Sequence, residues 1–470
     1  MSAASPNGSP SSSGRGTEST ADYGKTASFL AIGVGLTGVI TYVYFFIASH
    51  VLSRPDYGQI TVLWSAVFIT ISTLYRPIEQ LLSRNIAQHT VKGESISSTM
   101  RVASTIQLGL SLSFAVVALA LRGPIQNGVL EGNETLYWVF FSAVLFYAAS
   151  YFARGFLAGS KRFGLFVALI FSESCFRTIF AVLVAVSVLS GQSAVAIGIV
   201  AAPALSLMVV PFAFARRAKR EQAAAPSQAA SEEGDSSVSM AKGGGFAAAV
   251  LVIMFSEQAF LNAGPLVIRG LQGAAAAGFI FNVLMIARAP LQLFQAISTS
   301  ILPHLTSLHT SEEPGSEDEF HRSVRMVLLG LVAFTALALL FMAAVGPKAM
   351  QIAFSNKFTY DREGLLLVTL GMGLYLGSVT VNQACIAQGQ VRRAAARWIT
   401  CAALFIGWNF VPLVSNEFRR VEIGFLLAAA VLFSLLYYVY RRPHERPEDV
   451  PMPGSPEELE AELAMIDENV

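Results

Sequence analysis

Long apolar runs alternate with short polar stretches along the chain. Each run is about 20 residues long, which lets a helix cross a hydrocarbon core of roughly 30 Å. The period-two alternation of a membrane β-barrel is absent. Because backbone polar groups cannot stay unpaired in lipid, the pattern predicts an all-α polytopic membrane protein with about 12 transmembrane helices. The predicted spans are residues 28–52, 60–82, 102–121, 136–156, 165–189, 195–214, 245–264, 278–302, 326–345, 365–381, 398–413 and 423–440.

Polar stretches divide the chain into five parts. Residues 1–27 are rich in Ser, Gly and Pro and predict a disordered cytoplasmic tail. Residues 28–215 and 245–440 each hold six spans and predict two six-helix lobes, joined by a flexible cytoplasmic linker at 216–244. Residues 441–470 form an acidic tail.

Lys and Arg fall mostly in the segments that are cytoplasmic if the N-terminus is inside. We therefore expect a multi-pass protein of the cell (inner or plasma) membrane with both termini cytoplasmic. Composition agrees, since 54% of residues are hydrophobic and only 13% are charged, against about a quarter in soluble domains. A net charge of +1 gives no indication of a nucleic-acid partner.

Two short sequence similarities relate the N-terminal and C-terminal halves of the chain. The sequence YRPIEQ at 75–80 resembles ARAPLQ at 287–292, and GFLAGSKR at 155–162 resembles CIAQGQVR at 385–392. Both similarities fall at equivalent places in the predicted topology. They favour two parallel repeats, related by an axis along the membrane normal, around a central cavity.

Motifs for enzymatic chemistry are missing. The sequence has no phosphate-binding glycine loop followed by Lys and Ser or Thr, no HExxH, no GxSxG and no metal-spaced histidines. The three cysteines lie in or beside apolar runs and give no disulfide framework. We expect no enzyme, no cofactor and no metal site.

Ionisable residues inside the predicted spans are the candidates for function. Placing a charge near mid-membrane costs about 2.5–3.5 kcal/mol on insertion scales, so such residues should face a wet cavity or a partner. They are Arg76, Glu79, Glu173, Arg177, Glu257 and Arg288.

Two interpretations of these residues stay open. Arg76 with Glu79, and Glu173 with Arg177, share helix faces and could be structural ion pairs within one helix. Alternatively, Arg76, Arg177 and Arg288 line a cationic cavity for a phosphate or diphosphate, which the planar guanidinium suits. Arg288 has no acid within one turn, so it needs Glu257 or an anionic ligand.

Two prolines stand beside the predicted arginines. Pro77 and Pro290 each remove a backbone donor and are expected to bend their helices, either for packing or for movement. The first span has no ionisable residue before His50, and its Tyr42 and Tyr44 are expected mainly to pack.

Three motifs carry a family resemblance. LSRPDYG at 52–58 resembles the turn after the first span of Wzx-like polysaccharide flippases, RGFLAG at 154–159 their fourth-to-fifth loop, and ILPHL at 301–305 their exit from the eighth span. These flippases belong to the multidrug/oligosaccharidyl-lipid/polysaccharide (MOP) exporter superfamily. The resemblance covers nearly all of residues 28–440.

The resemblance implies a flippase that moves a polyprenyl-(pyro)phosphate-linked saccharide to the outer leaflet by alternating access, for cell-surface polysaccharide biosynthesis. It implies a lipid-linked glycan and membrane lipids as partners, and makes envelope glycosyltransferases or a polymerase candidate partners. Related lipid II flippases use arginines in the first and eighth spans; Arg288 matches the latter, but the first span has none. Glu79, Glu173 or Glu257 could bind a coupling proton. A cation-coupled drug exporter and a non-transporting scaffold remain as alternatives.

Overall fold

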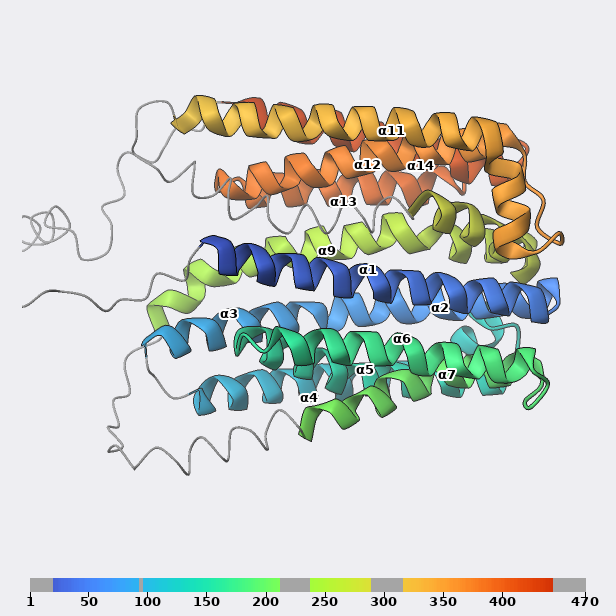
Figure 1. The fold of residues 1–470 in the computed structure, drawn as a ribbon, viewed down its shortest axis with the longest axis horizontal. Helices are drawn as coiled ribbons and strands as arrows, with labels where there is room; N and C mark the ends of the chain where they lie inside the picture. Colours follow the sequence, from blue (N-terminus) through green and yellow to red (C-terminus); the bar gives the residue numbers. More distant parts are fainter. Residues whose placement is uncertain (1–19, 93–95, 212–236, 289–315, 443–470) are drawn as a thin grey trace, which may run out of the picture.

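The fold consists of long, roughly parallel helices (Figure 1). A computed structural model describes residues 20–92, 96–211, 237–288 and 316–442, and this part of the chain contains no strand. The helices are α1 (Thr20–Val51), α2 (Arg54–Leu74), α3 (Arg76–Lys92), α4 (Ser97–Ala120), η1 (Pro124–Val129), α5 (Glu134–Gly159), α6 (Phe163–Ala185), α7 (Gly191–Ser206), η2 (Leu207–Val209), α9 (Ser237–Gln272), α11 (Ser316–Phe354), α12 (Arg362–Ala387), α13 (Val391–Trp408) and α14 (Glu417–Arg441), together with the unlabelled helix Ala274–Arg288.

The helices run up and down between two ends. We call the end at which α1 begins, left in Figure 1, the proximal end, and the opposite end distal. Helices α1 to α7 form one layered group, and α11 to α14 form another. Helix α9 packs on α13 in its own half and on α2 across the interface. We call α1 to α7 the N-terminal lobe, and α9, the helix Ala274–Arg288 and α11 to α14 the C-terminal lobe.

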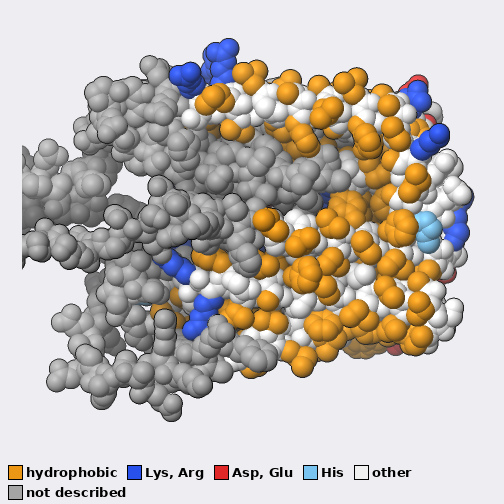
Figure 2. All heavy atoms as spheres, viewed as in Figure 1, with side chains coloured by type: hydrophobic (Ala, Val, Ile, Leu, Met, Phe, Trp, Pro, Cys, Tyr) orange, Lys and Arg blue, Asp and Glu red, His pale blue; other side chains and the backbone are white. Residues whose placement is uncertain are grey.

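The membrane-spanning prediction is confirmed as a fold class. Within the described ranges, ten helices are long and apolar enough to cross a bilayer, and the helix Ala274–Arg288 is a shorter apolar one. Apolar side chains cover the middle of the face in Figure 2, whereas many of the charged side chains lie toward its two ends. Leu108 and Leu112 of α4 are 69% and 67% exposed, as expected of residues that face lipid. The protein is a multi-pass membrane protein.

The predicted second span, 60–82, is interrupted. Helix α2 ends at Leu74, Tyr75 is a turn, and α3 starts at Arg76. Pro77 lies in the first turn of α3, where its missing N–H removes no helical hydrogen bond. The structure thus places the break two residues before Pro77. Pro290, the end of the eighth predicted span, and most of both tails and the linker lie outside the described residues.

Small residues let the helices of the N-terminal lobe approach closely. A Cβ on Gly155 would lie 2.8 Å from the carbonyl oxygen of Glu79, and one on Gly159 would lie 2.7 Å from that of Ser83. Helices α3 and α5 therefore meet nearly backbone to backbone, as small-residue interfaces in membranes do. This contact fixes the position of the end of α5 that carries Arg154.

Candidate functional site

A cavity of about 290 Å³ lies between the lobes. Helices α1, α2, α5 and α6 supply one wall, and α9 and the helix Ala274–Arg288 supply the other. The lining residues are Val34, Thr37, Gly38, Thr41, Tyr42, Phe45, Trp64, Phe68, Tyr147, Arg154, Ile170, Glu173, Ser174, Arg177, Gln258, Leu261, Asn262, Phe281, Met285 and Arg288. Two of the three predicted arginines, Arg177 and Arg288, are among them.

Arg177 is a buried cation held by neutral groups. Its side chain is 2% exposed. The guanidinium donates to Tyr147 Oη at 3.3 Å, Ser174 Oγ at 3.1 Å and Thr41 Oγ1 at 3.4 Å, and it lies 4.5 Å from the ring centroid of Trp64. No ion pair to Arg177 occurs among the described residues, and its Nε has no hydrogen-bond partner. The charge is therefore solvated by dipoles and a ring face but not neutralised by an acid.

Glu173 pairs with a residue of another helix. Arg154 Nη2 of α5 lies 2.5 Å from Glu173 Oε2, and Ser150 Oγ donates to the same oxygen at 3.2 Å. Both partners are largely buried. The interpretation in which Glu173 neutralises Arg177 within α6 is therefore wrong, because the carboxylate is occupied by Arg154. Arg154 lies near the end of the predicted fourth span, 136–156, and α5 continues for more than a turn beyond it.

Arg288 ends the described part of its helix without an acidic partner. It makes no ion pair within the described ranges, and its buried Nε lacks a hydrogen-bond partner. The phenols of Tyr42 and Tyr375 lie near its guanidinium. Sequence analysis expected either Glu257 or an anionic ligand to neutralise Arg288. Glu257 forms no ion pair with Arg288 in the described ranges, which leaves an anionic ligand as the remaining expectation.

The other predicted residues lie away from the cavity lining. Arg76, Glu79 and Glu257 do not line it. Arg76 lies within electrostatic range of both Glu79 and Glu257. No ion pair within 4 Å joins Arg76 to Glu79 in the described chain. Glu79 is also within electrostatic range of Arg154.

Arg154, Trp64 and Tyr42 line the cavity but were not among the predicted site residues. Arg154 was matched to a loop by the family resemblance, Tyr42 was expected mainly to pack, and Trp64 carries no charge that would single it out. Tyr42 Oη donates to the carbonyl oxygen of Met285 at 2.5 Å, so it bonds one lobe to the other. Tyr44, by contrast, is buried in the core as expected. Aromatic residues inside apolar runs look alike in sequence, and only the packing distinguishes them.

The distal end is closed by contacts between the lobes. A Cβ on Gly58 of α2 would lie 1.8 Å from the carbonyl oxygen of Ala274. Close by, Tyr57 donates to Asn282, and Glu131 accepts from the Ala274 N–H at 3.1 Å. Lys357 donates to the carbonyl oxygen of Leu52 at 3.0 Å. We call these contacts the distal seam.

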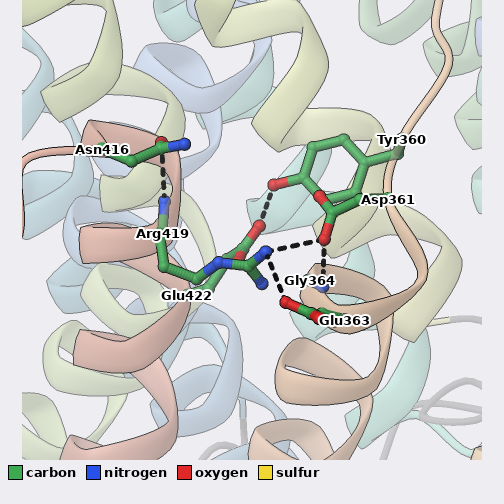
Figure 3. A network of polar contacts seen from close by, with 7 residues as sticks. All are labelled: Tyr360, Asp361, Glu363, Gly364, Asn416, Arg419 and Glu422. Atoms are coloured by element: carbon green, nitrogen blue, oxygen red, sulfur yellow. Dashed lines mark hydrogen bonds and ion pairs between the residues drawn. The ribbon is translucent and has the colours of Figure 1, made fainter.

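An ion network stabilises the distal end of the C-terminal lobe (Figure 3). Arg419 of α14 lies 2.7 Å from Asp361, 3.3 Å from Glu363 and 3.0 Å from Glu422. Asp361 caps α12 by accepting from the Gly364 N–H at 3.0 Å. Burial acts to raise the pKa of Asp361, but the bonds from Gly364 and Arg419 outweigh it and lower that pKa.

No protein-family model matches the sequence, and no curated protein matches it either. Solved structures do match. A multidrug resistance MATE family transporter of the MOP superfamily, in an inward-facing conformation, aligns with TM-score 0.63 and 12% identity over 88% of this chain and 97% of its own. The chain has the MATE transporter fold.

Two further structures with the MATE fold agree. VcmN of Vibrio cholerae gives TM-score 0.56 at 16% identity, over 88% of this chain and 97% of its own. The eukaryotic MATE transporter AtDTX14 aligns with a TM-score of 0.57 and 15% identity, over 88% of this chain and 95% of its own. The expected fold of membrane helices is thus confirmed as the MATE fold. The narrower likeness to polysaccharide flippases is not among these matches.

Proposed function

We propose that this protein exports an amphipathic anion by alternating access, and that the anion is a lipid-linked saccharide phosphate or diphosphate. The single observation behind the proposal is that Arg177 and Arg288 line one cavity without an acidic partner in the described chain. Buried charges normally find a counter-ion because desolvation is costly. An anionic head group would supply it.

The head group would lie between the two lobes. Arginine donates paired hydrogen bonds to phosphate and keeps its charge at any working pH. Arg177 belongs to the N-terminal lobe and Arg288 to the C-terminal lobe, so one phosphate group bound by both would couple the lobes. The lipid tail would remain in the bilayer beside the cavity.

The acids are candidates for the coupling step. Glu173 neutralises Arg154 in the cavity wall. Protonating Glu173 would leave Arg154 as a further cation and strengthen anion binding. Glu79 and Glu257 lie outside the cavity lining. Glu79 is within electrostatic range of Arg154.

A cation-coupled exporter of small amphipathic drugs is the second candidate. Six aromatic side chains line the cavity, and aromatic faces bind apolar and cationic solutes. The structures that share the fold include a transporter described as conferring multidrug resistance. The charge of the lining distinguishes the two candidates, because its three arginines outnumber its one carboxylate and disfavour a cation.

A flipping assay tests the proposal. Purified protein in liposomes is given a fluorescent polyprenyl-diphosphate saccharide, and its movement between leaflets is followed by quenching. Arg177→Gln and Arg288→Gln should each slow flipping at least about tenfold, the usual loss for a hydrogen bond to a charged group. Arg122→Gln, which removes a partly exposed arginine at the distal end, is the matched control.

The outcomes separate the candidates. Normal flipping by both cavity variants at normal protein level would exclude the assigned roles of Arg177 and Arg288. Export of a cationic dye without movement of the saccharide lipid would instead establish the drug exporter. In cells that need the glycan, the proposal predicts that Arg288→Ala reduces the surface glycan while the protein level stays normal.

A further inference from the structure

A second hollow lies on the outside of the C-terminal lobe, away from the central cavity. It is a groove of about 940 Å³ between α11 and α14, near the proximal end. Helix α11 forms the upper edge of the molecule in Figure 1. Only 11% of its most apolar stretch is buried, so this face meets the bilayer. We call the hollow the α11–α14 groove.

Three arginines stand at the proximal end of this groove. Arg322 and Arg325 lie one turn apart on α11 and are exposed. Arg441, at the end of α14, is held in place because its Nε and Nη2 donate to Tyr437 Oη at 3.1 and 2.8 Å. Among the side chains that the structure describes, the lining of the groove includes no Asp or Glu. These described residues give the end of the groove a cationic character.

The groove becomes apolar away from that end. Leu328, Leu329 and Val332 follow the arginines on α11, and Phe433 faces them from α14. Arg322 and Val332 are ten residues apart, which on a helix is roughly 15 Å. Leu329 and Val332 are 59% and 66% exposed. A cationic end joined to an apolar channel of this length matches a charged head group followed by an acyl chain.

We propose that the α11–α14 groove binds an anionic phospholipid from the leaflet at the proximal end. The charges decide the class of lipid, because three arginines with no acid in the described lining attract a net negative head group more than a zwitterionic one. The apolar stretch of the groove favours a lipid over a free anion, because only a lipid has an acyl chain to contact it. The site is separate from the central cavity and shares no lining residue with it.

Lipid titration of the full-length protein in neutral detergent, read by native mass spectrometry, tests this site. Phosphatidylglycerol and phosphatidylcholine are compared. The double variant Arg322→Gln/Arg325→Gln should weaken phosphatidylglycerol binding by about 30-fold, since each arginine near anionic head groups contributes about fivefold. Phosphatidylcholine binding should change little.

Two further variants keep the test decisive. Arg392→Gln/Arg393→Gln removes the same charge from exposed positions at the start of α13, outside the groove, and should leave phosphatidylglycerol binding unchanged. Val332→Trp fills the apolar channel and should weaken binding of both lipids.

Three results would overturn the proposal. Equal losses in the two double variants would mean general attraction to the charged end. Unchanged binding in Arg322→Gln/Arg325→Gln would mean that these two arginines do not hold the head group. Glycerol phosphate binding as tightly as phosphatidylglycerol would exclude a role for the channel.

Discussion

The two lobes place their charges in different positions. The N-terminal lobe puts an ion pair, Arg154 with Glu173, into the cavity wall and adds Arg177 beside it. The C-terminal lobe gathers its ion pairs around Arg419 at the distal end and leaves Arg288 alone in the cavity. The N-terminal wall therefore holds an acid together with two cations, whereas Arg288 is the one charged residue among the described lining of the opposite wall. The two walls thus differ in how their charges are compensated.

The largest effect is expected from breaking the pair in the N-terminal wall. Glu173→Gln leaves Arg154 buried beside a neutral amide and should lower the free energy of unfolding by about 3 kcal/mol or more. Denaturant unfolding in detergent measures the loss. Glu134→Gln breaks the exposed Arg122–Glu134 pair and should cost less than about 1 kcal/mol. Equal losses in both variants would remove the distinction between the cavity wall and the surface.

A methyl group in the distal seam should shift the lobes apart. Gly58→Ala forces the side chain against the backbone of Ala274, an overpacking that costs about 1–3 kcal/mol in the closed state. Spin labels on the exposed Asn127 and Asn356, one in each lobe, should then report longer distances. Gly109→Ala, which has open space around its Cβ, is the control. An unchanged distance distribution would show that the seam does not hold the lobes together.

The hydrogen bond across the cavity should have a smaller effect. Tyr42→Phe removes the bond to Met285 and should destabilise the closed arrangement by about 1 kcal/mol. The same labels should show a modest increase in the open population. Tyr137→Phe removes a similar bond to Ala118 within the N-terminal lobe and should leave the distances unchanged. A larger shift in Tyr137→Phe would contradict the assignment.

The network of the C-terminal lobe predicts the smallest effect and a dependence on pH. Asp361→Ala removes a helix cap and should cost about 1 kcal/mol at neutral pH. Folding lowers the pKa of Asp361, so its stabilisation is present above the unfolded pKa of about 3.9. This stabilisation is lost as the pH falls through the pKa of Asp361 in the folded protein. The difference in stability between Asp361→Ala and wild type should therefore vanish at that pH. Thermal unfolding measured from neutral to acidic pH checks this, and a constant difference would contradict it.

The sequence predicted the helices better than their partners. Apolar runs reveal where a chain crosses the bilayer, so the helical fold class was correct. The break at Tyr75 was not placed to the residue, although Pro77 indicated a bend nearby. Spacing along one helix suggested that Glu173 faces Arg177, but a partner on a neighbouring helix cannot be read from such spacing, and Arg154 takes that place. Arg154 lay inside the predicted span 136–156, but nothing in the sequence indicated that it would pair with Glu173.

The distal seam has a consequence for how the contact between the lobes responds to salt. Its tightest contact joins the Cα region of a glycine to a main-chain carbonyl, and its Tyr57–Asn282 bond joins two uncharged groups. Neither carries a formal charge, whereas Glu131 and Lys357 contribute the charged contacts of the seam. A rise in ionic strength would therefore weaken only those two contacts and leave the glycine contact and the Tyr57–Asn282 bond in place.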